Sequence, residues 1–236
     1  MVLLIRKKHL IAAVTGTVLL LGAAAVCPRP PAAAAAAAAD TGQVVVLDAG
    51  HGGADGGAVS DSGVAESGIN LAITRRLGGV LSFCGHTVAL TREGEDALCD
   101  GTGTLRQQKV SDTKERVELV NGFPYAFLIS IHQNSLPGHP SVRGAQSFHN
   151  GKGSAEAAAL AIQQVLNSAV NERDKDARRM DDSIYLMKHA DCPAVLVECG
   201  FLSNPEETAL LQQPDYQLHM AAAIAAGFCQ YCTNEG

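Results

Sequence analysis

A ten-residue stretch, Val44 to Gly53, most constrains what this chain can fold into. It opens with three valines and a leucine, an apolar and mainly β-branched run that is typical of a buried strand. After an aspartate and an alanine, the run Gly-His-Gly-Gly allows the backbone to turn sharply and to approach a ligand closely. The stretch predicts a strand over residues 43–48, followed by a loop in which His51 either binds a metal at a sheet edge or is simply a polar loop residue.

Composition limits the chain to one domain and argues against a nucleic-acid partner. The chain has 236 residues, of which 47% are hydrophobic, enough for one good core. Its formal net charge is −6, and its basic residues do not cluster beyond the N-terminus. Trp is absent and other aromatic residues are scarce, so a surface on which bases could stack is not expected.

The N-terminus has the pattern of a targeting segment. Basic residues at Arg6 to Lys8 precede an apolar run from Leu10 to Val26, whose length is near the upper limit for a signal peptide and the lower limit for a membrane span. We predict a signal peptide or N-terminal membrane anchor over residues 1–27 and a Pro/Ala-rich tether over residues 28–41. The basic flank should remain in the cytoplasm, so the rest of the chain is exported and is secreted, cell-wall associated or anchored to the membrane.

The cysteines are expected to be structural. All of them except Cys27 lie beyond the targeting segment, and exported cysteines usually pair. Cys229 and Cys232 have the spacing of a redox motif, but they belong to an alanine-rich helical run and not to the turn after a strand. We therefore expect structural thiols or a disulfide, and neither a catalytic pair nor a zinc site made of cysteines.

Apolar periodicity predicts strands that alternate with helices along the rest of the chain. Further strands are expected at residues 86–91, 125–131, 144–149, 184–187 and 194–198. Helices are expected to end at residues 83 and 121 and to span 154–170, with Ser154 as N-cap, 205–212 and 214–232. This alternation predicts one α/β domain over residues 42–236, with a mostly parallel twisted sheet of about five to six strands and helices on both faces.

Ionisable side chains follow or end three of the predicted strands: His51, His132 and Glu198. Ligand sites of α/β sheets gather at the carboxyl ends of strands, and Glu66, at the start of the first long helix, follows His51 closely enough to lie beside it. Two histidines and one glutamate would leave the fourth position of a catalytic zinc open for water. Glu198, outside that ligand set, could then carry the proton of the water to a leaving amine.

Each of these residues also has a structural interpretation. Glu66 at a helix start complements the helix dipole, and His132 after a strand can be an ordinary side chain near the core. Glu198, after four apolar residues, is harder to explain in this way, because an unpaired buried carboxylate is costly. The convergence of all four residues on one sheet edge favours a site.

The same residues carry a resemblance to a known family. The chain resembles the zinc-dependent N-acetylmuramoyl-L-alanine amidases of the third amidase family, which cut peptidoglycan, over almost all of residues 44–231. Four motifs of the family occur in this chain in the same order. The family's Asp-x-Gly-His-Gly-Gly strand end corresponds to Asp48–Gly53, and its glutamate at a helix start corresponds to Glu66–Ser67. Its Ser-Ile-His-x-Asn corresponds to Ser130–Asn134, and its Glu-x-Gly-Phe-x-Ser-Asn corresponds to Glu198–Asn204. The resemblance implies that His51, Glu66 and His132 bind Zn²⁺ and that Glu198 is the catalytic base.

The resemblance also implies the substrate: peptidoglycan glycan strands, cut at the amide between N-acetylmuramic acid and L-alanine of the stem peptide. A narrower similarity is to the spore-cortex branch, whose amidase helps to make muramic-δ-lactam. It rests on Gly144 to Phe148, the polar stretch before Tyr185, and the small single-domain layout. Residues 150–153 leave little room for the inhibitory helix that some division-associated relatives insert there, so we expect a site that does not block itself. The abundance of cysteine departs from the family.

Other residues are secondary candidates. His139, His149, His189 and Arg92 could contact substrate, whereas His86 and His219 are expected to be structural. Asp48 is expected either to orient a ligand histidine or to have a structural role.

Two other functions remain compatible with the sequence. One is a different zinc hydrolase of cell-wall material, a peptidase or a deacetylase, which product analysis would distinguish from an amidase. The other is a non-catalytic wall-binding factor, which would not need a positioned base. The sequence also leaves open an activator protein as a partner.

Overall fold

The computed structural model describes residues 42–235, so the predicted leader and tether at residues 1–27 and 28–41 lie outside the described residues. The strands are β1 (Val44–Ala49), β2 (Thr87–Leu90), β3 (Ala126–Asn134), β4 (Gln146–His149), β5 (Arg178–Arg179) and β6 (Ala194–Phe201). The helices are α3 (Glu66–Phe83), α4 (Leu105–Asn121), α5 (Ala155–Ala169), α6 (Tyr185–His189), α7 (Pro205–Leu211) and α8 (Pro214–Glu235). Among the described helices, none is both long enough and apolar enough to cross a membrane.

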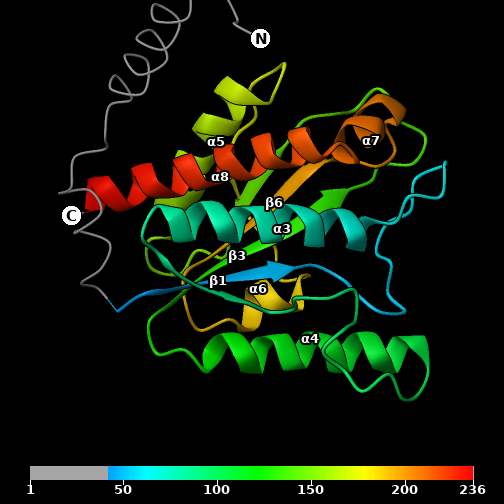
Figure 1. Cartoon of the computed structure of the whole chain (residues 1–236), viewed down its shortest axis with the longest axis horizontal. Coiled ribbons are helices and arrows are strands. Elements are labelled where there is room, and N and C mark those ends of the chain that lie inside the picture. The colour runs from blue at the N-terminus through cyan, green and yellow to red at the C-terminus, as the bar shows by residue number, and fades with distance from the viewer. Residues whose placement is uncertain (1–41, 236) are drawn as a thin grey trace, which may run out of the picture. The chain divides into compact units, whose positions relative to one another are not determined.

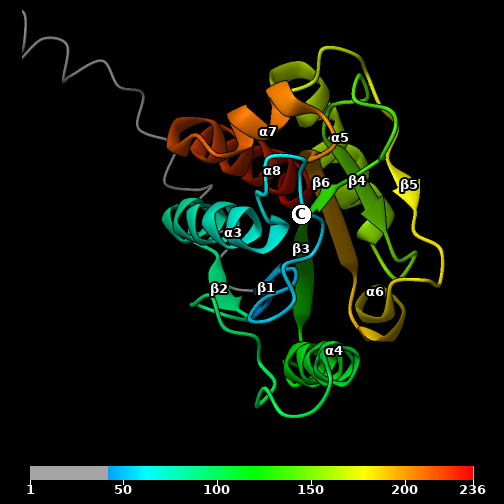
Figure 2. The same ribbon diagram turned by 90° about the vertical axis from the view of Figure 1, so that its right-hand side faces the viewer.

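All six strands form one sheet, in the order β2-β1-β3-β6-β4-β5. The first four of these pair in parallel, whereas β4 runs antiparallel to β6 and parallel to β5. Helices α3, α5 and α8 cover one face of the sheet, and α4 and α6 cover the other (Figures 1 and 2). The predicted fold class, a mostly parallel sheet with helices on both faces, is confirmed.

The two central strands, β3 and β6, each begin with a run of four apolar residues because both of their faces are covered. Phe127 and Ile129 on β3 pack in the core under α3, α5 and α8, while Leu128, between them, packs under α4 and α6. The three side chains are fully buried, which stabilises the fold by about 1.5–3 kcal/mol for each of them. By the same alternation Asp48, near the end of β1, and its register partner Ser130 on β3 lie on the side of α4.

The structure corrects three local predictions. Residues 184–187 were expected as a strand, but residues 185–187 belong to helix α6, where Leu186 and Met187 bury a short apolar run that periodicity alone could not assign. Strand β5 was missed because its two exposed arginines show no apolar alternation. Ser154 is the N-cap residue of α5, but its side chain makes no capping hydrogen bond, and its hydroxyl is 2.5 Å from the Tyr231 hydroxyl instead.

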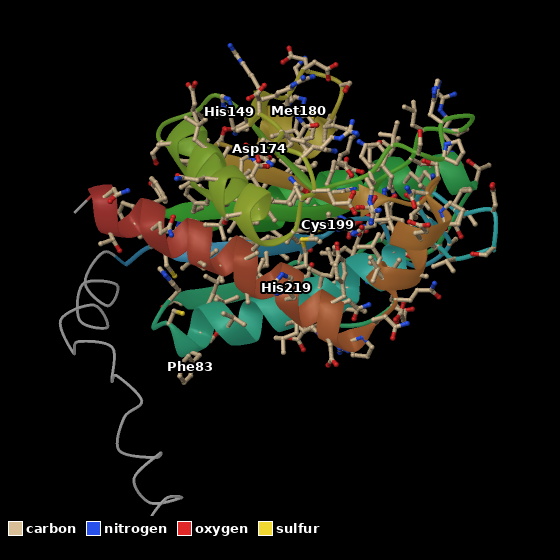
Figure 3. The ribbon with its side chains drawn as sticks, turned by 90° about the horizontal axis from the view of Figure 1, so that it is seen from above. Phe83, His149, Asp174, Met180, Cys199 and His219 are labelled. Atoms are coloured by element: carbon tan, nitrogen blue, oxygen red, sulfur yellow. The ribbon has the colours of Figure 1, made fainter. Side chains whose placement is uncertain are left out.

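The cysteines of the described residues are all free. Cys199 is fully buried in the core (Figure 3). Cys229 and Cys232 on α8 are partly buried and pack against the same core. The Cys229 sulfur lies 3.6 Å from Nε2 of His86, whose ring packs on Phe228. These positions agree with the expected structural thiols and with a structural role for His86.

Candidate metal centre

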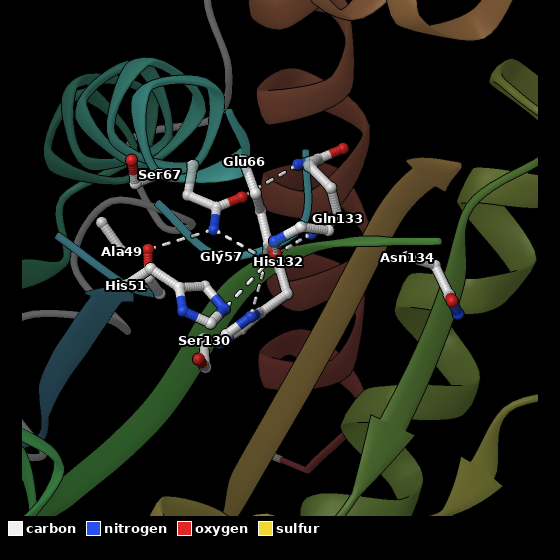
Figure 4. A network of polar contacts seen from close by, with 12 residues as sticks. Ala49, His51, Gly57, Glu66, Ser67, Ser130, His132, Gln133 and Asn134 are labelled. Carbon is white, nitrogen blue, oxygen red and sulfur yellow. Dashed lines mark hydrogen bonds and ion pairs between the residues drawn. The ribbon is translucent and has the colours of Figure 1, made fainter. Parts of the chain in front are cut away.

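The three predicted metal ligands come together at the carboxyl ends of β1 and β3. His51 lies in the loop after β1, Glu66 is the first residue of α3, and His132 lies in β3. One ligand atom from each lies within 4.8 Å of the others, and the three side chains point toward one another (Figure 4). Nε2 of His51 is 3.3 Å from Oε2 of Glu66, and Nδ1 of His132 is 2.9 Å from Oε1. This group can hold a metal ion.

Two glycines make room for this group. A Cβ atom at Gly50 would lie 2.2–2.7 Å from ring atoms of His132, so the histidine can pack there only because the residue has no side chain. A Cβ atom at Gly57 would lie 2.5 Å from Oε2 of Glu66, and its φ of +72° also favours glycine. His51 itself has a φ of +62°, which non-glycine residues seldom adopt.

Asp55 orients the His51 ring, a role that was not predicted. Its Oδ2 is 2.8 Å from Nδ1 of His51, which leaves Nε2 of that ring toward Glu66. Lys109 on α4 holds the other oxygen of Asp55 at 2.7 Å. A carboxylate on the remote ring nitrogen fixes the orientation and tautomer of a metal-binding histidine. The signal available in the sequence was an aspartate four residues beyond the loop histidine.

Glu66 is buried, and both of its carboxylate oxygens accept hydrogen bonds. Its Oε1 accepts hydrogen bonds from the side chain of Asn70 (3.0 Å) and the backbone of Gln133 (3.0 Å), and its Oε2 accepts one from the backbone of Ala58 (2.8 Å). Burial raises the pKa of Glu66, but the hydrogen bonds with His132 and His51 outweigh burial and hold the pKa well below its usual range. The side chain is therefore a carboxylate at neutral pH.

The environment of His51 favours a positive charge. Burial lowers the pKa of this histidine, but the hydrogen bonds with Asp55 and Glu66 outweigh burial and raise the pKa to about 9. A divalent cation can satisfy the same carboxylates in place of the proton, which is released when the metal binds. The donor set and its charge therefore fit a metal ion, and histidine nitrogen with carboxylate oxygen is a ligand set typical of zinc.

Glu198 lies beside this group on the next strand. It is the register partner of His132 in the parallel pair β3–β6, and its Oε2 is buried without a hydrogen-bond partner among the described residues. Burial raises the pKa of Glu198 to about 7, with His132 lowering it, Glu66 raising it and His51 lowering it by smaller amounts. A carboxylate with this pKa and a free oxygen can accept and return a proton near neutral pH.

Asp48 does not orient a ligand histidine. Its carboxylate accepts hydrogen bonds from Ser130 (2.6 Å) and Thr91 (2.8 Å), and it pairs with Arg116 at 2.5 Å. Burial raises the pKa of Asp48, but the Arg116 guanidinium, together with His132 and the hydrogen bonds from Ser130 and Thr91, outweighs burial and lowers the pKa to about 2. Arg92 was considered either as a possible substrate contact or as a solvated loop cation, but it is buried, and its guanidinium donates to backbone carbonyls.

The other histidines of the described residues lie outside the group. Because β4 is antiparallel to β6, Gln146 lies beside Glu198, whereas His149 lies beside Val195 near the start of β6. His189 contacts Asn121, just before β3, at the edge where the parallel strands begin. His149 and His189 were therefore wrong candidates, while His139 is exposed in the segment that follows β3.

Two further observations agree with the predicted layout. Nε2 of His219 contacts the carbonyl of Ala169, which is a structural role. Residues 150–154, between β4 and α5, contain no helix in the described structure, as the short connection predicted.

Comparison with known proteins now assigns the chain. A family model described as N-acetylmuramoyl-L-alanine amidase matches residues 45–230, which include all four predicted site residues. The chain belongs to this family. It is therefore a peptidoglycan amidase, which hydrolyses the bond between N-acetylmuramic acid and L-alanine of the stem peptide.

Several relatives support the assignment. The amidase is 38% identical to the germination-specific N-acetylmuramoyl-L-alanine amidase of Bacillus subtilis (strain 168), over 83% of this chain and 82% of that protein. Its structure matches the CwlD amidase from Clostridioides difficile, solved in complex with the GerS lipoprotein, with a TM-score of 0.77 and 35% identity over 81% of this chain and 98% of that one. It also matches the catalytic domain of the amidase CwlV from Bacillus (Paenibacillus) polymyxa var. colistinus, with a TM-score of 0.68 and 30% identity over 80% and 97% of the two chains.

Proposed function

We propose that the amidase is zinc-dependent, that His51, Glu66 and His132 bind the metal, and that Glu198 is its general base and acid. The observation that carries this proposal is the arrangement of the four residues. Three of them form a group with a zinc-like donor set, and the fourth lies beside the group with a buried oxygen that lacks a partner. Zinc bound there would lower the pKa of a water molecule and polarise the amide carbonyl.

The protein's own residues would move the proton. Glu198 takes a proton from the attacking water and passes it to the nitrogen of L-alanine as the amide bond breaks, because a poor amine leaving group must depart protonated. The pKa of about 7 suits both steps near neutral pH. Asp55 keeps the His51 ring in the orientation that ligation requires.

The biological setting is also a proposal. We infer that the amidase acts in the spore cortex, during formation of muramic-δ-lactam, on the basis of its identity to the germination-specific relative and its similarity to CwlD. The sequence pattern of residues 1–41 supports an exported protein that is secreted, cell-wall associated or membrane-anchored. The complex of CwlD with a lipoprotein supports an activator protein as a partner of this amidase.

The experiment is a comparison of Glu198→Gln with wild type, using the full chain and purified peptidoglycan. We expect one zinc per wild-type chain and release of stem peptides that begin with L-alanine. Glu198→Gln should retain the zinc and lose activity by about 10²–10⁴-fold, the usual contribution of general acid–base catalysis. Glu118→Gln, which changes an exposed glutamate on α4, is the matched control and should behave as wild type.

The alternatives give different results. Loss of zinc from Glu198→Gln would make Glu198 a ligand and contradict the assigned roles. Release of free acetate would indicate a deacetylase, and cleavage within the stem peptide would indicate a peptidase. Zinc-loaded wild type that binds peptidoglycan without turnover, even with an activator added, would indicate a wall-binding factor.

A further inference from the structure

Two buried arginines contact the backbone beside the proposed metal ligands His51 and Glu66, and neither takes part in the chemistry described above. We propose that Arg92 and Arg116 form an arginine clamp, a pair of positioning residues that hold the backbone carrying His51 and Glu66 in the geometry for metal binding. This inference rests on the metal site of the proposed function. Both side chains are almost fully buried, 6% exposed for Arg92 and 3% for Arg116, so their donors serve the protein and not the substrate.

Arg116, from α4, holds the loop that carries His51. Its Nη2 donates to the carbonyl of His51 at 2.7 Å, and its Nη1 donates to the carbonyl of Ala49 at 2.7 Å. The two nitrogens of one planar group thus fix the carbonyls on both sides of Gly50. Because the His51 backbone has a φ of +62°, which is unfavourable for a side-chain-bearing residue, this conformation needs such support.

Arg92, just after β2, joins the same loop to the helix that carries Glu66. Its Nε donates to the carbonyl of Ala49 at 2.9 Å, and its Nη2 lies 3.3 Å from the carbonyl of Gly50. The same Nη2 donates at 2.8 Å to the carbonyl of Ser67, the residue next to Glu66. One guanidinium therefore sets the separation between the backbone segments of two metal ligands that come from different elements.

The third ligand is connected to the clamp through Asp48. Arg116 pairs with Asp48, and the other oxygen of Asp48 accepts a 2.6 Å hydrogen bond from Ser130, two residues before His132 on β3. Asp112 receives the remaining Nε donor of Arg116 at 2.8 Å. The buried positive charge of Arg116 is thus balanced by carboxylates, and its hydrogen bonds reach the segments of both histidine ligands.

The function of the clamp depends on the shape of arginine. The planar guanidinium offers several donors in fixed directions, whereas the ammonium of lysine is a compact charge on a flexible stem. A lysine at either position therefore keeps the positive charge, but the donors on its single nitrogen cannot reproduce the spacing and fixed directions of the guanidinium donors. This difference separates positioning from simple charge balance.

The test compares Arg92→Lys and Arg116→Lys with wild type, using the full chain stripped of metal. Arg106→Lys, an exposed arginine on α4, is the matched control. Zinc affinity is measured by competition with a chelator of known affinity, and Co²⁺ is bound separately so that its visible absorption reports ligand geometry. Circular dichroism and thermal unfolding establish the temperature at which each metal-free variant is folded, and all affinities are measured below it.

We expect both clamp variants to bind zinc about 10–100-fold more weakly, the usual cost of removing a group that orients a metal ligand, and to show an altered Co²⁺ spectrum. Their kcat should fall with little change in KM, since neither arginine contacts substrate. Arg106→Lys should match wild type in every measurement. Folded clamp variants with the zinc affinity and Co²⁺ spectrum of wild type would overturn the inference.

Arg92→Lys keeps the test decisive if Arg116→Lys does not fold. The recorded hydrogen bonds of Arg92 all go to carbonyls, so its replacement leaves the Arg116 pairs with Asp48 and Asp112 in place. The two proposals also fail separately. Wild type that binds no zinc contradicts the proposed function and removes the basis of the clamp, whereas zinc-binding wild type with unaltered folded variants contradicts the clamp alone.

Discussion

Of the two glycines that make room for the proposed metal centre, Gly50 is the one where an added side chain would come closer to a proposed ligand. The imidazole of His132 occupies the space that any side chain at this position would need. The conformation of the loop and the position of a ligand from another strand therefore depend on one missing Cβ atom. From sequence alone, a glycine at the end of a strand is explained by the turn that follows. Here Gly50 also leaves space for the His132 ring on the neighbouring strand, and only the pairing of the strands reveals this role.

Gly50→Ala should abolish metal binding while the core remains folded. The added methyl group would meet His132 ring atoms at 2.2–2.7 Å, so the ring must leave its place beside Glu66. Zinc content and peptidoglycan hydrolysis measure the effect. Gly68→Ala on α3, where an added Cβ meets nothing within 4 Å, is the control and should stabilise the protein by about 0.5–1 kcal/mol. Normal zinc binding by Gly50→Ala would show that the ring can move without loss of ligation.

Glu198 should lower the stability of the metal-free protein in a pH-dependent way. Its pKa is about 7 in the folded protein and 4.5 as an ordinary glutamate, so folding disfavours the charged form. This penalty is complete above pH 7 and disappears below pH 4.5. Glu198→Gln should therefore raise the free energy of unfolding at pH 8 by about 1–3 kcal/mol and have little effect at pH 4. Urea unfolding at both values provides the measurement, and an equal effect at the two pH values would contradict the assigned cause.

At the scale of elements, α4 links the surface of the protein to the metal centre. Lys109 pairs with Asp55 in the His51 loop, and Arg116 donates to the His51 carbonyl and pairs with Asp48. Asp112, one turn before Arg116, pairs with that arginine. Its N-terminus is fixed by a capping box, in which Thr104 accepts from the backbone of Gln107 and the Gln107 side chain accepts from the backbone of Thr104. The helix thus begins at a defined residue and places its inner side chains reproducibly.

Thr104→Ala should cost about 1 kcal/mol of stability, the usual effect of losing an N-cap side chain. Zinc affinity should change little, because fraying is expected to stop before the turn that carries Arg116. Thr104→Ser keeps the capping hydroxyl and is the control. Chemical denaturation of the metal-free protein gives the stability, and a large loss of zinc affinity would mean that the helix start is coupled to the metal centre.

The elements also show what sequence could and could not predict. The strands β1, β3 and β6 were found because a buried parallel strand is a continuous apolar run, and the residues that follow such runs, His51, His132 and Glu198, were found with them. The direction of β4 leaves no local pattern, so His149 was placed at the wrong edge. Arg116 was missed, and Arg92 was considered only as a possible substrate contact, because their partners are set by tertiary contacts, such as Arg116 with Asp48, 68 residues apart.

For the whole molecule, the metal centre joins parts of the chain that the sheet alone does not connect. Its ligands come from a loop, a helix and a strand, and a bound ion would restrain all three together. Since an ion that binds only the folded state stabilises it by mass action, metal binding and unfolding are linked.

Removal of zinc should lower the midpoint of thermal unfolding. At a free zinc concentration of 1,000 times the dissociation constant, the added stability is about 4 kcal/mol. Scanning the wild type with zinc and with a chelator measures the difference. His51→Ala should unfold at the same temperature under both conditions, and a zinc-dependent shift in that variant would point to a second metal site.

The spacing of the ligands along the chain has a consequence for folding kinetics. Glu66 and His132 are 66 residues apart, and they meet only when α3 has packed and β3 has paired with β1. Contacts of such long range form slowly and late, because the intervening loop must close first. A refolding chain should therefore regain hydrolysis only with its last cooperative step, and a partly folded chain would be unable to cut peptidoglycan.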